Sequence, residues 1–101
     1  MIICILEMRA APGLRVEFLA LCEEGVPRAI RGGCLGADIL VEAEEPDIVV
    51  LVERWPSDQV FQSFTATEWA DTALMAKYRE LAVGMPKLRQ FAVVSQTGSG
   101  Q

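Results

Sequence analysis

Five aromatic side chains in the second half of the chain could form the walls of a binding pocket. They are Trp55, Phe61, Phe64, Trp69 and Tyr78. Flat rings stack well on a planar small molecule, and the indole and phenol groups add hydrogen-bonding atoms. Aromatic residues at helical spacing also pack in protein cores, so each of the five has a second interpretation as a core side chain. The chemistry that they indicate is recognition of a small apolar or aromatic molecule.

Trp69 and Tyr78 are the two of these rings with polar tips that fall in the same predicted helix. They are nine residues apart, which places them on opposite sides of a continuous helix. We therefore expect that they do not face the same pocket. Tyr78 shares a helical face with Leu74 and Leu81 and is the stronger pocket candidate, whereas Trp69 has contact with a partner subunit as its alternative.

Two carboxylates and two arginines could act on a polar ligand group. Glu7 and Glu53 lie near the ends of predicted strands, and either could serve as a base if burial raised its pKa. Arg79 could hold a phenolate by charge-assisted hydrogen bonding, or it could be a solvated helix cation. Arg89 lies within an apolar strand, where it could hold an oxyanion, occupy a sheet edge or form a salt bridge across a dimer.

The chain contains no histidine, which excludes an imidazole base, a Ser-His-Asp triad and a histidine-bound haem iron for this chain alone. The three cysteines, Cys4, Cys22 and Cys34, are widely spaced and form no C-x-x-C pair. That pattern argues against structural zinc and against a disulfide framework. We predict no metal site, three buried thiols, and a reducing, cytoplasmic setting.

Composition excludes several further classes of protein. The 101 residues include 9 basic and 14 acidic side chains, a net charge of −5, which argues against nucleic-acid binding. No apolar run approaches the roughly 20 residues of a membrane helix, and the apolar N-terminal run has no basic segment before it, so we expect neither a membrane span nor a secretion signal. The length fits one domain over residues 1–95, followed by a flexible Gly/Ser tail over residues 96–101.

The first half of the chain predicts a strand, a helix and a hairpin. Met1–Arg9 is strongly apolar and indicates a buried strand. An apolar stripe at helical spacing begins at Leu14, and Pro27 is expected to end or kink this helix. Cys34–Ala43 and Ile48–Val52 are predicted strands, joined by a turn that is rich in acidic residues and contains a proline.

The second half predicts a broken helix and a final strand. Ser57 is a suitable N-cap for a first segment, Asp58–Phe64. A capping box formed by Thr65 and Glu68 would start a second segment, Glu68–Val83, and Leu88–Ser95 forms the last strand. The order β-α-β-β-α-β predicts an α+β, ferredoxin-like fold, with a four-stranded antiparallel sheet and helices on one face.

Three strands carry more apolar side chains than a sheet covered on one face requires. Ile2–Leu6, Ile48–Val52 and Phe91–Val94 are apolar at every position, so both faces of the sheet should be covered. Leaving five such side chains in water would forgo roughly 8–15 kcal/mol, which is as large as the stability of a whole domain. We therefore predict a homodimer in which the two sheets pack face to face.

These features resemble the antibiotic biosynthesis monooxygenase (ABM) superfamily, whose members are dimeric α+β barrels. The resemblance covers about residues 2–95 and is clearest over Val49–Phe64, where an apolar strand ends in Glu53-Arg54-Trp55 before a Ser57-capped helix with spaced phenylalanines. The turn Gly32–Gly36 also looks like the glycine-containing turn of the family.

The resemblance implies a ligand pocket between the sheet and the helices of each protomer. Oxygenase-type members oxidise anthrones or quinols related to aromatic polyketides with molecular oxygen and no cofactor. Their pattern of Trp, Asn, Tyr and Arg falls here on Trp55, Leu51, Phe61 and Arg79. Two of these four polar positions are therefore apolar in this chain, and the missing histidine argues against the haem-degrading branch.

The resemblance and the predicted aromatic face together lead us to expect a catalytic set of Trp55, Tyr78 and Arg79. The substrate-binding side chains would be Leu51, Phe61, Phe64, Trp69 and Arg89. Because polar family positions are lost, a non-catalytic ligand-binding or regulatory dimer of the same fold stays open as an alternative. A polyketide cyclase or isomerase that uses the same pocket without oxygen is the third interpretation.

Overall fold

Four antiparallel strands form a single sheet with the strand order β2-β3-β1-β4. The computed structural model describes residues 1–98 of the chain. Its elements are β1 (Ile2–Arg9), α1 (Arg15–Arg31), β2 (Gly36–Val41), β3 (Ile48–Trp55), α2 (Asp58–Ala70), α3 (Thr72–Leu81) and β4 (Lys87–Ala92). The predicted α+β, ferredoxin-like fold is confirmed, with the second helical segment divided in two.

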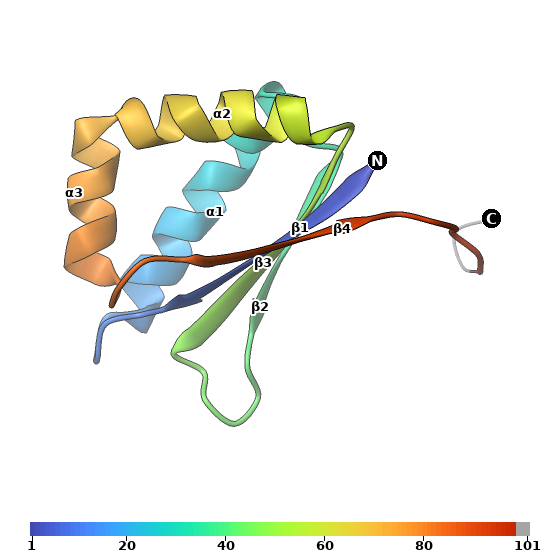
Figure 1. Cartoon of the computed structure of the whole chain (residues 1–101). Helices are drawn as coiled ribbons and strands as arrows, with labels where there is room; N and C mark the ends of the chain where they lie inside the picture. Colours follow the sequence, from blue (N-terminus) through green and yellow to red (C-terminus); the bar gives the residue numbers. More distant parts are fainter. Residues whose placement is uncertain (99–101) are drawn as a thin grey trace.

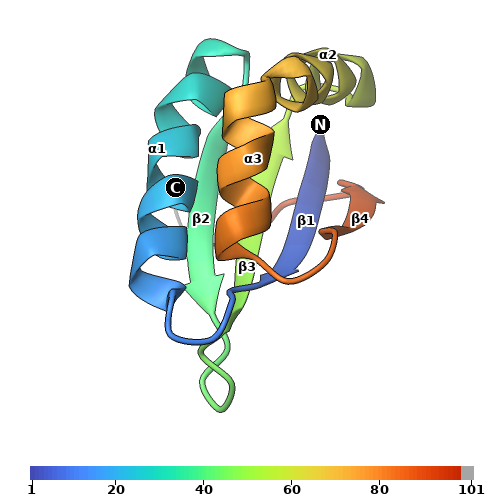
Figure 2. The ribbon, with the colours of Figure 1, turned by 90° about the vertical axis from the view of Figure 1, so that its left-hand side faces the viewer.

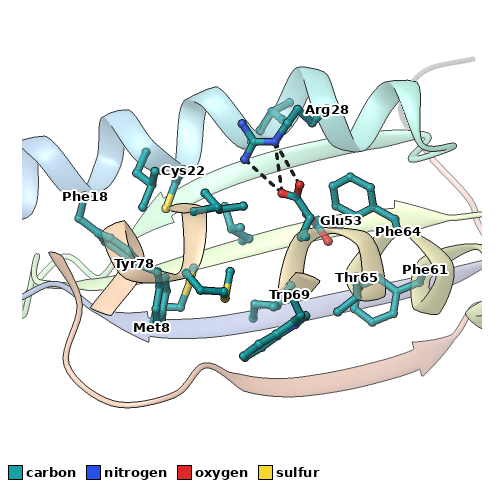
Figure 3. Close-up of a pocket in the computed structure, with 18 residues that line it drawn as sticks. Met8, Phe18, Cys22, Arg28, Glu53, Phe61, Phe64, Thr65, Trp69 and Tyr78 are labelled. Carbon is teal, nitrogen blue, oxygen red and sulfur yellow. Dashed lines mark hydrogen bonds and ion pairs between the residues drawn. The ribbon is translucent and has the colours of Figure 1, made fainter. Parts of the chain in front are cut away.

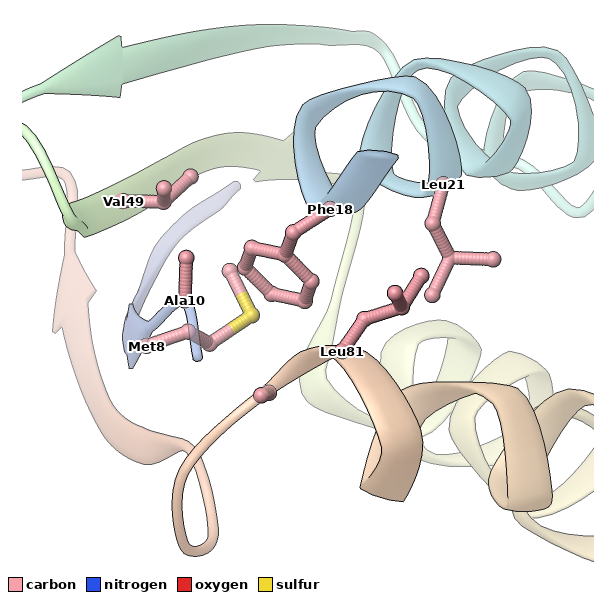
Figure 4. Packing of buried hydrophobic residues seen from close by; sticks show 7 residues of the cluster. Met8, Ala10, Phe18, Leu21, Val49 and Leu81 are labelled. Atoms are coloured by element: carbon pink, nitrogen blue, oxygen red, sulfur yellow. The ribbon is translucent and has the colours of Figure 1, made fainter. Parts of the chain in front are cut away.

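All three helices lie on one face of the sheet, as the two perpendicular ribbon views show (Figures 1 and 2). Alternate side chains of each strand point toward the helices, which follows from the two-residue period of a strand. One core cluster joins Met8 and Val49 of the sheet to Phe18 and Leu21 of α1 and Leu81 of α3 (Figure 4). A second cluster surrounds Trp55, so the core lies entirely between the sheet and the helices.

Pro27 neither ends α1 nor separates its last turn, which corrects one alternative of the sequence analysis. The helix continues to Arg31 with Pro27 inside it. Proline removes only its own amide donor, and contacts made after it hold the last turn in place. Ala29 is buried in the second core cluster, and its carbonyl accepts a hydrogen bond from Cys34 N at 2.9 Å.

The break in the second helical segment comes at Asp71 and not at the predicted Thr65–Glu68 box. Ser57 caps α2 as predicted by accepting a hydrogen bond from Val60 N at 3.3 Å. The helix then passes through Thr65 to Ala70, and Asp71 starts α3 by accepting from Leu74 N at 3.0 Å. An aspartate side chain satisfies a free amide of a new helix as well as a threonine does, so both positions carried a valid start signal.

Strand bounds differ modestly from the predicted ones. β3 extends beyond Val52 to Trp55, β2 is shorter than Cys34–Ala43, and β4 ends at Ala92 before Ser95. Residues 96–98 lie outside any helix or strand, and the last three positions of the predicted tail, 99–101, fall outside the described residues. Within residues 1–98, no helix combines the length and the apolar character that a membrane crossing would require.

The sheet face opposite the helices bears no element of the described chain (Figures 1 and 2). Its centre is apolar, and charged residues lie at its edges and strand ends. We call this face the outer face. It carries Ile3, Ile5, Leu40, Val50, Val52 and Phe91, which the strand register brings together. Leu40 and Phe91 are among the exposed large hydrophobic residues. Because the strands are apolar on both sides, a single protomer leaves hydrophobic side chains exposed on this face of the sheet.

Candidate functional site

A pocket of about 160 Å³ lies between the helix-facing side of the sheet and the three helices (Figure 3). An apolar cavity of roughly 150 Å³ is enough to hold benzene, so this space takes one aromatic ring, and a polycyclic ligand would extend beyond it. Its sheet side is formed by Leu6 and Met8 of β1 and by Leu51 and Glu53 of β3. These residues alternate along their strands, which is why the same face presents all four.

The helix side of the pocket contains four of the five predicted aromatic residues. Phe61, Phe64 and Trp69 come from α2, and Tyr78 comes from α3. The expectation that Trp69 and Tyr78 cannot share a pocket is wrong, because Asp71 breaks the helix between them and α3 turns in a new direction (Figure 3). Trp69 is 45% exposed and marks the side where the pocket meets solvent.

Trp55 lies beneath the pocket in the protein core and does not line it. Its side chain is 0% exposed and packs on Phe61 and Phe64, with ring centroids 5.6 and 5.4 Å away. Its indole nitrogen donates a hydrogen bond to Glu53 Oε1 at 3.1 Å. Trp55 can therefore influence a bound ligand through Glu53 and through the phenylalanine rings that it supports.

Glu53 is the carboxylate that the structure buries, whereas Glu7 is exposed on the outer face. Glu53 is 7% exposed and lines the pocket. Burial raises the pKa of Glu53 above its usual value of 4.5. The Trp55 hydrogen bond opposes this shift, and the negative charge of Glu68 adds to it. The pocket thus contains a carboxyl group whose charge is held in apolar surroundings.

The raised pKa of Glu53 predicts a specific dependence of stability on pH. Folding favours the protonated carboxyl, so the wild-type free energy of unfolding should fall as pH rises from 4.5 through the raised pKa, and then level off. Glu53→Gln has no proton to lose and still offers Trp55 an acceptor. We expect the variant to gain stability relative to the wild type over this pH range, measured by urea unfolding.

The matched control for this measurement is Glu80→Gln, because Glu80 is exposed on α3 and its charge is already in water. Its difference from the wild type should vary much less with pH. A Glu53→Gln difference that stays constant from acid to neutral pH would show that burial does not penalise the Glu53 charge.

Tyr78 lines the pocket and carries an unsatisfied polar group. Among the described residues, its hydroxyl is the buried side-chain atom that has no hydrogen-bond partner. The ring packs edge-on against Phe18 at 5.8 Å between centroids. Burial, with a smaller effect of Cys22, raises the pKa of Tyr78 to about 12, so the hydroxyl stays protonated near neutral pH. A buried hydroxyl without a partner favours a ligand atom that can accept its hydrogen.

An ion pair between Arg28 and Glu68 crosses the pocket from α1 to α2 (Figure 3). The guanidinium Nε and Nη2 atoms lie 3.1–3.3 Å from the Glu68 carboxylate oxygens. Both side chains are partly exposed, at 34% and 22%. Sequence reasoning missed this pair because its members are 40 positions apart and no local pattern links them.

The structure does not bring the two predicted arginines to the pocket. Arg79 is exposed on α3 and is absent from the pocket lining. Arg89 is on the outer face, where its guanidinium carbon lies 5.1 Å from the centroid of the Phe91 ring. Among the described residues, the arginine that lines the pocket is Arg28.

The cysteines are free thiols. Cys4 and Cys34 are buried as predicted, whereas Cys22 is only partly buried and lines the pocket. Burial raises the pKa of Cys22 to about 12, which keeps this thiol protonated and weakly nucleophilic. Across residues 1–98, no group of three Cys, Asp or Glu side chains is arranged to hold a metal ion. The polar chemistry of the pocket therefore centres on Glu53, Tyr78 and the Arg28–Glu68 pair.

Solved structures share the architecture of this chain. A crystal structure of an antibiotic biosynthesis monooxygenase is 23% identical, covers 94% of this chain and 100% of its own, and superposes with a TM-score of 0.78. Rv0793 from Mycobacterium tuberculosis is 18% identical, with 96% and 98% covered and a TM-score of 0.78. A candidate antibiotic biosynthesis monooxygenase from Deinococcus radiodurans is 14% identical over all of both chains, with a TM-score of 0.82. At these identities the likeness shows the fold.

The family is shown by the sequence itself. No curated protein matches the chain. The family model described as antibiotic biosynthesis monooxygenase matches residues 1–81, which includes β1 to α3 and every residue that lines the pocket. Since this match covers most of the chain, the protein belongs to the antibiotic biosynthesis monooxygenase family.

Proposed function

We propose that this protein is a cofactor-independent monooxygenase that oxidises an electron-rich phenolic aromatic, of the anthrone or quinol type, in polyketide-related secondary metabolism. The observation that carries this proposal is an apolar pocket of aromatic-ring size that is lined by Tyr78, whose hydroxyl is buried and unpartnered. Family membership supports the reaction class. A cytoplasmic location fits the free thiols that the chain carries.

The substrate itself supplies the electrons in such a reaction. Oxidation of a methylene carbon to a carbonyl releases four electrons, and O₂ accepts all four. One oxygen atom enters the product and the other leaves as water, so no external reductant is required. The protein must then bind the ring, favour its deprotonated form and exclude water.

The pocket residues divide into walls and polar contacts. Leu51, Phe61 and Phe64 give an apolar wall against which a flat ring can pack, and Trp69 extends this wall toward solvent. Tyr78 would donate its hydrogen to the phenolic oxygen and stabilise negative charge there. Trp55 acts as a positioning residue beneath this set, because it contacts Glu53, Phe61 and Phe64.

The active form that we propose is a homodimer built on the outer face. Contiguous exposed apolar surface on a sheet marks an interaction site, and the strand register brings Ile3 and Ile5 of β1 beside Val50 and Val52 of β3 on this face. A second copy of the chain covers it with an equally apolar surface under two-fold symmetry. Arg89 lies at this face and is better placed for a contact across the dimer than for the pocket.

Tyr78→Phe tests the role of the pocket hydroxyl. A hydrogen bond to a charged acceptor contributes about 1.5–3 kcal/mol, and each 1.4 kcal/mol is a factor of ten. We therefore expect kcat/KM for oxygen uptake to fall about tenfold to a hundredfold with a panel of hydroquinones and anthrone. Oxygen uptake is measured with an oxygen electrode at a temperature at which both the wild type and the variant are fully folded.

Thermal unfolding of the same variant is the internal control. The wild-type hydroxyl has no partner, so its removal should leave the melting temperature unchanged or raise it. Unchanged oxygen uptake in Tyr78→Phe would remove this residue from the mechanism. Tight binding of the panel by the wild type without oxygen uptake would instead identify a ligand-binding dimer, and conversion without oxygen would identify a cyclase or isomerase.

A further inference from the structure

Glu53 combines three properties that the walls of the pocket do not share: burial, a carboxylate and direct contact with the ligand space. We propose that Glu53 is the catalytic base of this pocket, taking a proton from the substrate carbon or hydroxyl that is to be oxidised. This inference rests on the proposed oxygenase function and assigns its proton-transfer step. In a chain without histidine, a carboxylate is the side chain in this pocket that can accept a proton near neutral pH.

The two carboxylate oxygens of Glu53 have different surroundings. Oε1 accepts the hydrogen bond from Trp55 Nε1 at 3.1 Å, and this bond fixes the plane of the carboxyl group. Oε2 accepts no hydrogen bond from the described residues. Among the described residues, the fully buried side-chain polar atom without a partner is the Tyr78 hydroxyl. Oε2 also lacks a partner but is not in that group, so part of its surface is open. Oε2 is therefore the atom that can receive the proton.

Glu53 and Tyr78 lie at different positions along the pocket (Figure 3). Tyr78 is near Phe18 and Met8, whereas Glu53 lies toward Phe64 and Arg28. A ring between them would present its phenolic oxygen to the Tyr78 hydroxyl and a reacting hydrogen to Oε2. This arrangement selects a substrate whose acidic hydrogen and oxygen are on separate parts of one aromatic system.

The charged and titratable groups around Glu53 come from three elements and from the segment before β2. Glu68 on α2 acts on its charge and is paired with Arg28 on α1. Cys4 on β1 and Cys34 before β2 interact with Glu53, and burial raises the pKa of both thiols, which keeps them neutral. The raised pKa of Glu53 makes its carboxylate a stronger base than an exposed one and brings its titration nearer to neutral pH.

The proton and electron balance closes on Glu53 for a methylene substrate. Oε2 takes one hydrogen as a proton, and the C–H electron pair stays on the delocalised substrate anion. The anion transfers these electrons to O₂ and forms a C–O bond, and the resulting peroxide anion takes the proton back from Glu53. Glu53 then removes the second hydrogen as the O–O bond breaks, which leaves a carbonyl and hydroxide, and the hydroxide takes that proton and leaves as water.

Hydrogen exchange without oxygen isolates the first step. The wild-type protein is mixed with anthrone in deuterated buffer under anaerobic conditions, and loss of the methylene proton signal is followed by NMR. We expect the wild type to accelerate exchange, at a rate that rises with pH through the raised pKa of Glu53. Glu53→Gln should lower the protein-dependent rate about a hundredfold and remove this pH dependence.

Two further variants make the result specific to the carboxylate. Glu53→Asp keeps the acid on a shorter side chain, so its exchange rate should lie between those of the wild type and Glu53→Gln. Glu80→Gln removes an exposed carboxylate from α3 and should exchange at the wild-type rate. Wild-type exchange in Glu53→Gln would overturn the assignment of the base.

Oxygen uptake measured on the same samples separates this inference from the proposed function. Exchange that depends on Glu53 without oxygen uptake would support the base and overturn the oxygenase. Oxygen uptake without accelerated exchange would support the oxygenase and overturn the role of Glu53. If the wild type shows neither accelerated exchange nor oxygen uptake, the role of Glu53 and the oxygenase function are both overturned. If only Glu53→Gln loses exchange and oxygen uptake, both are supported.

Discussion

Trp55→Ala is expected to lower the free energy of unfolding by about 3–5 kcal/mol, which is the usual cost of removing a buried tryptophan. The side chain is fully buried, and its loss would leave a cavity beside Phe61 and Phe64. It would also deprive the Glu53 carboxylate of its indole donor. Because small domains have a total stability of only about 5–15 kcal/mol, this one change removes a large share of it.

Trp69→Ala is the matched control, since it deletes the same side chain at a site that is 45% exposed. We expect a loss of stability well below that of Trp55→Ala, because half of the ring is already in water. Both variants are measured by urea unfolding at one protein concentration, which keeps any contribution of dimerisation equal. Equal losses in the two variants would contradict the placement of Trp55 in the core.

Val50→Lys is expected to convert a dimer of this protein to monomers. Val50 lies on the outer face of β3, directly across from Glu7 of β1, so a lysine there gains an oppositely charged neighbour within one protomer. A two-fold interface would instead bury two such Lys–Glu7 pairs against apolar surface, and removing these charges from water costs several kcal/mol per ion. In sedimentation at micromolar concentration, the variant should have a mass near 11.1 kDa, and the wild type twice that.

The control for this experiment is Val16→Lys, the same substitution at a residue of α1 that is 74% exposed. It should leave the mass of the wild-type dimer unchanged. A wild-type protein that sediments as a single chain would rule out the dimer, and a dimeric Val50→Lys would place the interface elsewhere on the molecule.

Local patterns predicted most of the fold. The apolar runs at Ile2–Leu6 and Ile48–Val52, with a helical stripe between them, led to the β-α-β-β-α-β order that the structure confirms. The errors fall where two local signals compete. Thr65 and Asp71 are both suitable helix starts, and the choice between them depends on which break lets α3 pack on α1 and the sheet.

The sequence predicts an aromatic pocket but only some of the residues that line it. The family resemblance implies its location, and the residue patterns indicate the aromatic walls Phe61, Phe64, Trp69 and Tyr78, all of which line it. The sequence analysis expects Arg79 and Arg89 in the pocket, where the structure does not place them, and it does not identify Arg28. A guanidinium at helical spacing can point to either side until the packing of its helix is known.

The sequence by itself determined that this chain forms a two-layer α+β protomer, that apolar runs place hydrophobic side chains on both faces of its sheet, and that its pocket must operate without histidine. These properties depend on composition and on short periodic patterns, which are local. Only the tertiary structure decided that Trp55 lies beneath the pocket, that Trp69 and Tyr78 share it, and that Glu53 rather than Glu7 is buried there. The physical reason is that side chains converge through the angle between packed elements, and a single helix break at Asp71 changes that angle without changing any periodicity.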